Sequence, residues 1–202
     1  MKIAIVYLFL ILISCKNSNE KYVAIESNVT DSEIYEVVNL VLSNKEEAIK
    51  RDMIKGAESP FKYLLDKDSG KTFDKNDSIK IFTGDSIFSN KDLSFIQKQI
   101  NSRKNFKFNK DSIQIKSLKI ISGDTIRSLI ENGLKNPTKN FHDLYFEKYG
   151  MHWFYIVSLP IFSKDKKTVF IKIDSFGSGQ TMVYKKVNNH WQFYCSVSNW
   201  IA

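Results

Sequence analysis

Apolar residues recur at helical spacing from residue 31 onward and at strand spacing in the last third of the chain. A long helix is predicted to begin at Asp31, because Thr30 and Glu33 fit a capping box, and to end near Gly56. Its apolar positions share one helix face, which we expect to be buried. That face consists of Ile34, Val37, Val38, Val41 and Leu42.

Shorter elements follow. Residues 92–101 are predicted to form a second helix, with Leu93, Ile96 and Ile100 facing inward. Residues 61–73 read as two short strands around a turn, and residues 78–82 and 112–122 read as further strands. A third short helix is predicted through Ile126, Leu129, Ile130 and Leu134, and residues 140–150 add a last helical turn before Gly150.

From Met151 onward, long segments alternate as strands and predict an antiparallel meander. Asn188 and Asn189 suit a two-residue hairpin turn. This turn pairs Lys186 with Trp191, Tyr184 with Phe193 and Met182 with Cys195, and we expect these six residues on the core face, with Lys186 over the ring of Trp191. Val183, Lys185, Gln192 and Tyr194 then lie on the other side.

The predicted fold class is α+β. An N-terminal helix and shorter helices pack on an antiparallel sheet that ends in a three-stranded C-terminal meander.

The first residues form an export signal. The segment "VYLFLILISCKNSN" contains an uncharged run that is too short to span a bilayer and apolar on every side, which is typical of a signal peptide. Its end, "LISC", resembles the lipobox of bacterial lipoproteins, which implies that Cys15 carries a diacylglycerol and fatty acids such as palmitate. We therefore expect a signal peptide at 1–14, a lipidated cysteine and polar tether at 15–29, and a single α+β domain at 30–202.

The charge and the cysteine content limit which molecules the protein can be expected to bind and whether a disulfide can form. The net charge falls only from +8 to +7 when Lys2 is removed with the signal peptide, and acids and bases alternate along the chain, so no nucleic acid partner is expected. The densest basic stretch places Lys98, Arg103, Lys104, Lys107 and Lys110 around Phe106 and Phe108. We interpret it as a solvated helix end leading into a strand, with anionic lipid or glycan binding as the alternative. Cys195 has no intramolecular partner in the mature chain and is expected to be buried.

The last third of the chain carries a family resemblance. "SLPIFSKDKKTVFIKI", a glycine-containing bend and "MVYKKVNNHWQF" resemble the C-terminal half of Bacteroidota-type envelope lipoproteins over roughly residues 140–200. The order of helices and terminal meander is also similar to cystatin-like and NTF2-like rolls. These resemblances imply an architecture and no particular activity.

Motifs that could carry chemistry are weak. Asp66, Asp68, Asp74 and Asp77 follow the spacing of a calcium loop, but Gly70 and Lys71 stand where a ligand and a glycine are required, so a plain turn is expected. Gly177 and Gly179 are read as a bend between strands and not as a phosphate-binding loop. No metal site and no cofactor are predicted.

The histidines offer a possible acid and base. His142 and Asp143 lie in an aromatic stretch with His152 close behind, but no nucleophile accompanies them. We expect no catalytic residues, and His190 should be solvated beside the hairpin turn.

Four Asp-Ser/Thr-Ile tripeptides recur along the chain. They are typical of turns and helix caps, and they also resemble the acceptor sites of Bacteroidota-type O-glycosylation, which makes Ser78, Ser86, Ser112 and Thr125 candidate modification sites.

The sequence thus predicts an envelope lipoprotein that is anchored in the outer membrane and acts as a non-enzymatic binding or interaction module. The sequence does not decide whether the domain lies on the periplasmic side or on the cell surface. Its partner would be an envelope protein, a glycan or a small ligand. The alternatives are a hydrolase or lyase with a pocket around His142, Asp143 and His152, and a structural subunit of an envelope complex. An exposed aromatic face bearing Tyr194 and Gln192 would favour a partner surface, whereas a deep pocket at the histidines would favour an enzyme.

Overall fold

The computed structural model describes residues 28–52, 59–66, 87–175 and 177–201, with the backbone alone described for residues 50–52. Within these ranges the chain forms four α-helices and a seven-stranded mixed sheet, which confirms the α+β class. The helical elements are α2 (Asp31–Asp52), α4 (Asn90–Ser102), the 3₁₀ turn η1 (Lys110–Ser112), α5 (Gly123–Lys135) and α6 (Phe141–Tyr149). The strands are β1 (Phe61–Leu65), β2 (Lys119–Ile121), β3 (Trp153–Val157), β4 (Ile161–Phe162), β5 (Thr168–Ser175), β6 (Ser178–Val187) and β7 (His190–Ile201).

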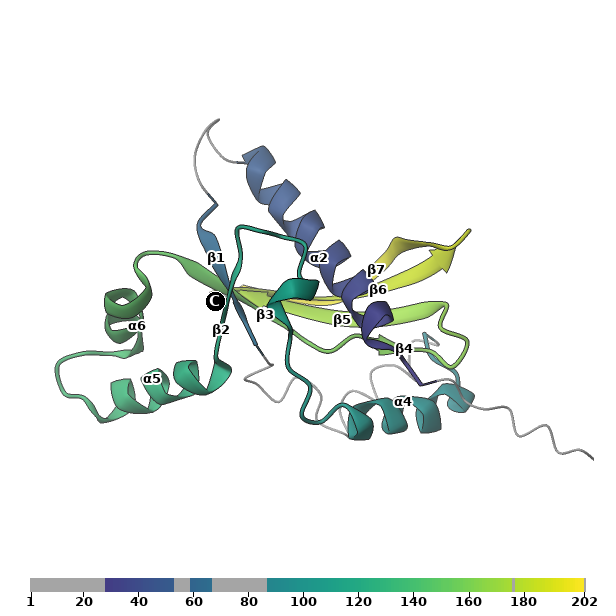
Figure 1. Ribbon diagram of the computed structural model, residues 1–202, viewed down its shortest axis with the longest axis horizontal. Coiled ribbons are helices and arrows are strands. Elements are labelled where there is room, and N and C mark those ends of the chain that lie inside the picture. The colour runs from purple at the N-terminus through teal and green to yellow at the C-terminus, as the bar shows by residue number, and fades with distance from the viewer. Residues whose placement is uncertain (1–27, 53–58, 67–86, 176, 202) are drawn as a thin grey trace, which may run out of the picture.

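The sheet separates two layers of helices (Figure 1). Strand order is β2-β1-β3-β5-β6-β7, and β4 continues the line of β3 by pairing with the other end of β5. Helix α2 covers one face of the sheet, and α4 together with the α5–α6 pair covers the other. None of the described helices has both the length and the apolar character that a membrane crossing requires.

Helix α2 follows its prediction closely. The Thr30 amide donates to Glu33 Oε2 at 2.8 Å, and the Glu33 amide donates to Thr30 Oγ1 at 3.2 Å, so the capping box is present. All five apolar positions of the predicted face are buried against the sheet. The predicted end of this helix, at Gly56, lies outside the described residues.

The expectation of a wholly antiparallel sheet was wrong at one edge. Strand β1 runs parallel to both of its neighbours, β2 and β3. The segments between these strands carry α4 and the α5–α6 pair, and connections of that length allow the chain to return to the same end of the sheet. The predicted C-terminal meander is present as β5, β6 and β7, which pair antiparallel in chain order.

The predicted strand at 112–122 is reduced to Lys119–Ile121. Asn39 of α2 explains the difference: its Nδ2 donates to the Ser112 carbonyl, and its Oδ1 accepts from the Gln114 amide, each at 2.9 Å. Because these backbone groups bond to a helix side chain, they need no strand partner. In α5, Ile126 is buried as predicted, but Leu134 is 83% exposed, so the apolar stripe of this helix continues past the core.

The β6–β7 hairpin confirms the predicted register only near its turn. Asn188 and Asn189 have positive φ, Lys186 pairs with Trp191, and Tyr184 pairs with Phe193. The register then slips, so that Cys195 pairs with Val183 and not with Met182. An extra residue in one strand turns the following side chains to the opposite face. The core-face position predicted for Cys195 was therefore wrong; the thiol is half-buried in the cluster under α4.

Candidate functional site

A cleft of about 330 Å³ opens between the C-terminal half of α2 and the end of the sheet where β5 turns into β6. This volume lies at the lower end of the range for small-molecule sites. We call it the α2 cleft. It is lined by Lys45, Ala48, Ile49, Phe61, Tyr155, Ile173, Asp174, Ser175, Ser178, Gly179, Gln180, Asn199, Trp200 and Ile201.

Aromatic rings on neighbouring strands form one part of the lining. Phe61 of β1 stacks on Tyr155 of β3, with ring centroids 4.5 Å apart and ring planes 10° from parallel. Ile49 of α2 and Ile173 of β5 add aliphatic surface beside the rings. This part of the cleft is therefore suited to an apolar or aromatic group.

A buried acid on α2 fixes the position of Tyr155. Glu46 is 4% exposed, and the Tyr155 hydroxyl donates to its Oε1 at 3.1 Å. Burial raises the pKa of Tyr155, and the charge and hydrogen bond of Glu46 raise it further. The hydroxyl is thus a hydrogen-bond donor to α2, and the ring presents its apolar face to the cleft.

The polar part of the cleft is built around a lysine. Lys45 Nζ donates to Gln180 Oε1 at 2.9 Å, and Gln180 Nε2 donates to Ser196 Oγ at 2.7 Å. Burial lowers the pKa of Lys45. An ammonium has three donors, so Lys45 can bond to an anion in addition to Gln180. Among the described lining residues it is the only cationic side chain.

Two serines complete the polar lining at the β5–β6 turn. The hydroxyls of Ser175 and Ser178 lie 3.0 Å apart, and Ser175 Oγ also donates to the Ser178 carbonyl at 3.3 Å. These hydroxyls bond to each other across the turn and not to a base. They can orient a bound ligand, but within the part of the chain that the structure describes they bond to no base that would activate either oxygen as a nucleophile.

One wall of the cleft is tied together on the opposite face of the sheet. Asp174, Gly179 and Trp200 are directly paired across β5, β6 and β7. Trp200 Nε1 donates to Asp174 Oδ1 at 3.1 Å, and Lys172 Nζ lies 2.6 Å from Asp174 Oδ2. A Cβ on Gly179 would lie 2.0 Å from both bonded atoms. The glycine leaves the space in which a tryptophan reaches across a whole strand.

The histidines of the alternative enzyme hypothesis are not part of this cleft. His142 is exposed in the first turn of α6, where its amide donates to Asn140 Oδ1 at 2.8 Å. Asp143 belongs to the capping box of α6 and accepts from the Asn140 amide at 2.9 Å. His152 is half-buried, and its carbonyl accepts from the Tyr145 hydroxyl at 2.8 Å. None of the three lines the α2 cleft or the second cavity described below.

The remaining predicted sites fall in different places. Cys15, Ser78 and Ser86 lie outside the described residues, as does most of the calcium-like stretch. Ser112 ends η1 and Thr125 lies in the first turn of α5, both half-buried. Gly177 lies at the bend between β5 and β6, as predicted, with φ +83°, whereas Gly179 lies inside β6, paired with Asp174 and Trp200. Among the described residues, no group of three His, Cys, Asp or Glu side chains is placed to hold a metal ion.

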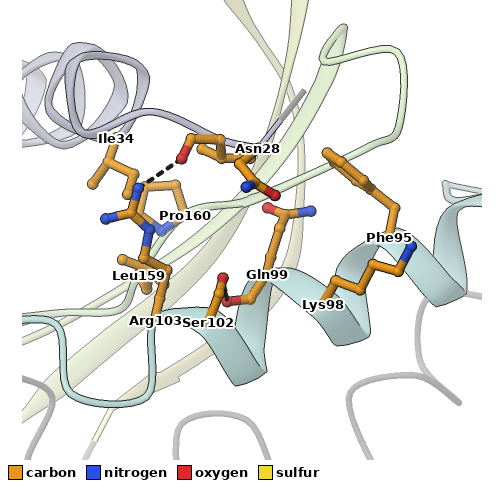
Figure 2. Close-up of a pocket in the computed structure, with 10 residues that line it drawn as sticks. Asn28, Ile34, Phe95, Lys98, Gln99, Ser102, Arg103, Leu159 and Pro160 are labelled. Atoms are coloured by element: carbon orange, nitrogen blue, oxygen red, sulfur yellow. Dashed lines mark hydrogen bonds between the residues drawn. The ribbon is translucent and has the colours of Figure 1, made fainter. Parts of the chain in front are cut away.

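A second cavity lies where the chain enters α2, beside α4 (Figure 2). Its volume is about 20 Å³, which is room for a single water molecule. Arg103 from the end of α4 spans it, and its Nη2 donates to the Val29 carbonyl at 2.7 Å. Phe106 and Phe108 of the same basic stretch pack against Tyr35 of α2. Much of this stretch therefore serves to hold α2 and α4 together.

Lys45, Glu46 and Tyr155 were missed by the sequence reasoning, although one signal was present. Glu46 follows Leu42 by four residues and so extends the apolar face of α2 with a carboxylate. A charge at a core position requires a buried partner, which Tyr155 supplies from a strand more than a hundred residues later in the chain. Comparisons of the chain with protein-family models, with curated proteins and with solved structures found no match.

Proposed function

We propose that the protein is a lipoprotein of the bacterial envelope, anchored through Cys15, whose domain binds a small amphipathic molecule in the α2 cleft. The ligand class is an apolar body, aliphatic or aromatic, that carries one anionic group. The observation that carries the proposal is the half-buried Lys45 ammonium at the polar side of a cleft lined by the stacked rings of Phe61 and Tyr155.

The charge balance supports an anion as the polar group of the ligand. Asp174 is the one acid among the described lining residues, and its two oxygens already bond to Trp200 and Lys172. Lys45 bonds to the neutral Gln180. A carboxylate bound beside Lys45 would compensate a charge that burial disfavours, and a charge-assisted bond of this kind is about twice as strong as a neutral one.

The cleft's chemistry supports binding in preference to catalysis. Its serines bond to each other, Tyr155 bonds to Glu46, and Lys45 bonds to a glutamine that Ser196 holds in place. General acid–base catalysis needs a group within reach of both a substrate and a proton acceptor. The described lining residues instead form fixed pairs, which suit recognition.

The place of the cleft also suits an anchored binding protein. Lys45 lies 14 residues along α2 from Asp31, which corresponds to about 21 Å at the rise of an α-helix. The proposed tether joins the other end of this helix. The cleft would then open away from the membrane surface, toward the compartment from which a ligand arrives.

Ligand binding is tested with a matched pair of probes, decanoate and decanol, titrated into the mature chain by calorimetry. We expect decanoate to bind more tightly, and Lys45→Met to weaken decanoate binding about 10-fold to 100-fold while decanol binding stays unchanged. Lys119→Met, an exposed lysine on the edge strand β2, is the control and should change neither affinity. Equal affinity for acid and alcohol in the native protein would refute the assigned role of Lys45.

The anchor is tested separately by mass spectrometry of the mature protein from its native host. An acylated Cys15 as the first residue supports the lipoprotein assignment. An unmodified later residue at the N-terminus contradicts it and leaves the cleft proposal standing.

A second candidate function, binding of an envelope protein, is favoured by the exposed surface of β7. Tyr194 is 55% exposed on this edge strand and lies against Lys185, and Gln192 is exposed as well. Phe193, which was predicted on the core face, is 56% exposed and contacts Tyr184, the neighbour of Lys185 in β6. A photo-crosslinking residue at position 194 should then join the chain to one specific partner in the native envelope. The same label at the exposed Leu134 on α5 is the control and should give no such product.

A further inference from the structure

The chain enters the described domain through a clamp of two cations. Lys166 Nζ donates to the Asn28 carbonyl at 3.3 Å, and Arg103 Nη2 donates to the Val29 carbonyl at 2.7 Å. Arg103 also pairs with Asp31, and Lys166 lies 2.9 Å from Glu33 Oε1. The position from which the preceding segment leaves the domain is therefore fixed by charged groups.

Further cations surround this point. Lys98 and Arg103 line the same small cavity as Asn28 (Figure 2). Lys104 directly follows Arg103 in the chain. The Lys164 amide donates to Asp92 Oδ1 at 2.7 Å, which holds the β4–β5 turn against the first turn of α4, where Lys91 lies. We call this surface the tether end. Its exposed lysines are Lys91, Lys98, Lys104, Lys164 and Lys167.

The acids at the tether end are already used within the fold. Asp31 pairs with Arg103 and Glu33 with Lys166. Asp92 is buried and accepts from Ser89 and from the Lys164 amide. Asp165 is exposed and accepts from Ser163 Oγ and the Lys167 amide. Among the described residues of this surface, Arg103, Lys166 and the five exposed lysines outnumber the four carboxylates, so their summed charge is positive.

We infer that the tether end docks on the anionic lipid headgroups of the membrane that holds the anchor. The inference rests on the proposed acylation of Cys15 for its geometry. Twelve residues lie between Cys15 and Asn28, and a fully extended chain of that length spans at most about 45 Å. The tether thus keeps this surface close to the membrane, where attraction between lysines and anionic lipid acts within a Debye length of about 8 Å.

Docking of this kind would orient the domain. Each lysine near an anionic surface strengthens association about fivefold. With the tether end on the headgroups, α2 rises from the membrane and the α2 cleft is held at its far end (Figure 1). The same surface explains why the basic stretch after α4 lies beside the entry of the chain and not beside the cleft.

The experiment uses the mature chain from residue 15 with Cys15→Ser, so that no acyl chain contributes. Its sedimentation with vesicles of 70% phosphatidylcholine and 30% phosphatidylglycerol is compared with its sedimentation with pure phosphatidylcholine, at low and at high NaCl concentration. We expect binding to the anionic vesicles only, and its loss at high salt. The double substitution Lys91→Glu and Lys104→Glu should weaken binding more than tenfold.

A matched control separates this surface from net charge. Lys116→Glu with Lys135→Glu makes the same change in charge at exposed positions away from the tether end, and should weaken binding less than threefold. Equal weakening by both pairs would show a nonspecific charge effect, and equal binding to neutral vesicles would exclude headgroup recognition; either result overturns the inference. Because no lipid anchor and no decanoate are present, these outcomes are independent of the tests of Cys15 and Lys45.

Discussion

Trp200 Nε1 donates to Asp174 Oδ1 at 3.1 Å, although a complete strand, β6, lies between the two residues. The bond is possible because Gly179 stands between them without a side chain. It joins the last residues of β7 to the end of β5 and so fixes the wall of the α2 cleft. Because Gly179 has no side chain, the residues on either side of it, Asp174 and Trp200, can contact each other across β6.

Replacing Gly179 by Ala should break this bond. The new Cβ would lie 2.0 Å from both Asp174 Oδ1 and Trp200 Nε1, so the indole must move. We expect the free energy of unfolding to fall by about 1 to 3 kcal/mol, which is typical of overpacking. The displaced indole of Trp200 should also change the tryptophan emission, to which Trp153 and Trp191 contribute as well. Urea unfolding followed by tryptophan fluorescence measures both.

Gly177→Ala provides the comparison for that variant. No atom lies within 4 Å of its added Cβ, but its φ of +83° disfavours alanine. The free energy of unfolding of Gly177→Ala should therefore fall by about 1 kcal/mol through backbone strain, while the tryptophan emission stays native. A native emission spectrum in Gly179→Ala would mean that the indole does not fill this space.

The contrast between these glycines shows what the sequence could and could not predict. The turn between β5 and β6 at Gly177 was predictable, because glycines between two alternating segments mark a turn. The role of Gly179 was not, because it depends on which residues the sheet register places beside it. Asp174 and Trp200 meet only through the pairing of three strands, and the β6–β7 register contains two shifts that the sequence did not reveal.

Replacing Tyr155 by Phe should destabilise the domain through Glu46. The variant keeps the ring that stacks on Phe61, but it removes the hydroxyl that donates to a buried carboxylate. A buried acceptor that loses its partner costs about 1 to 3 kcal/mol. Urea unfolding of Tyr155→Phe, Glu46→Leu and the double variant forms a double-mutant cycle. Additive effects in that cycle would contradict a direct coupling between the two side chains.

The Glu46–Tyr155 pair also shows the limit of reading α2 by itself. Its start, its cap and its apolar face were all predicted, because they depend on neighbours within a few residues. The partner of Glu46, Tyr155, was not predictable, because it lies on β3, more than a hundred residues later in the chain. The register of β3 against β1 also contains an irregularity. Local periodicity thus indicated most of the elements, whereas the cleft arises where α2 and five strands meet.

Stability at alkaline pH should report the burial of Lys45. Burial holds the pKa of Lys45 in the folded protein below the 10.5 of an exposed lysine. Below the folded pKa both states carry the proton, and the burial penalty is fully present. Between the folded pKa and 10.5 the unfolded chain binds more protons, so this lysine makes the free energy of unfolding rise with pH.

Comparison with Lys45→Met isolates that contribution. Tyrosines with raised pKa, such as Tyr155, lower stability at high pH in both proteins and therefore cancel in the difference. We expect the stability of the native protein to gain on that of the variant as pH rises toward 10.5, measured by urea unfolding at a series of pH values. A difference that does not change with pH would show that the ammonium is fully hydrated.

Trp191 should tolerate phenylalanine much better than alanine. Its ring packs against Phe162 at 5.9 Å, and Lys186 Nζ lies 5.0 Å from its centroid, as the hairpin register predicted. Its Nε1, however, is buried and has no hydrogen-bond partner among the described residues.

Trp191→Phe removes this unsatisfied donor and keeps the ring contact. The loss of packing is then largely offset, and we expect the free energy of unfolding to change by less than about 1 kcal/mol. Trp191→Ala removes the ring as well and should cost about 3 kcal/mol or more. Urea unfolding of both variants decides the point, because an equal loss in the two would show that Nε1 has a partner, such as a buried water, that phenylalanine cannot replace.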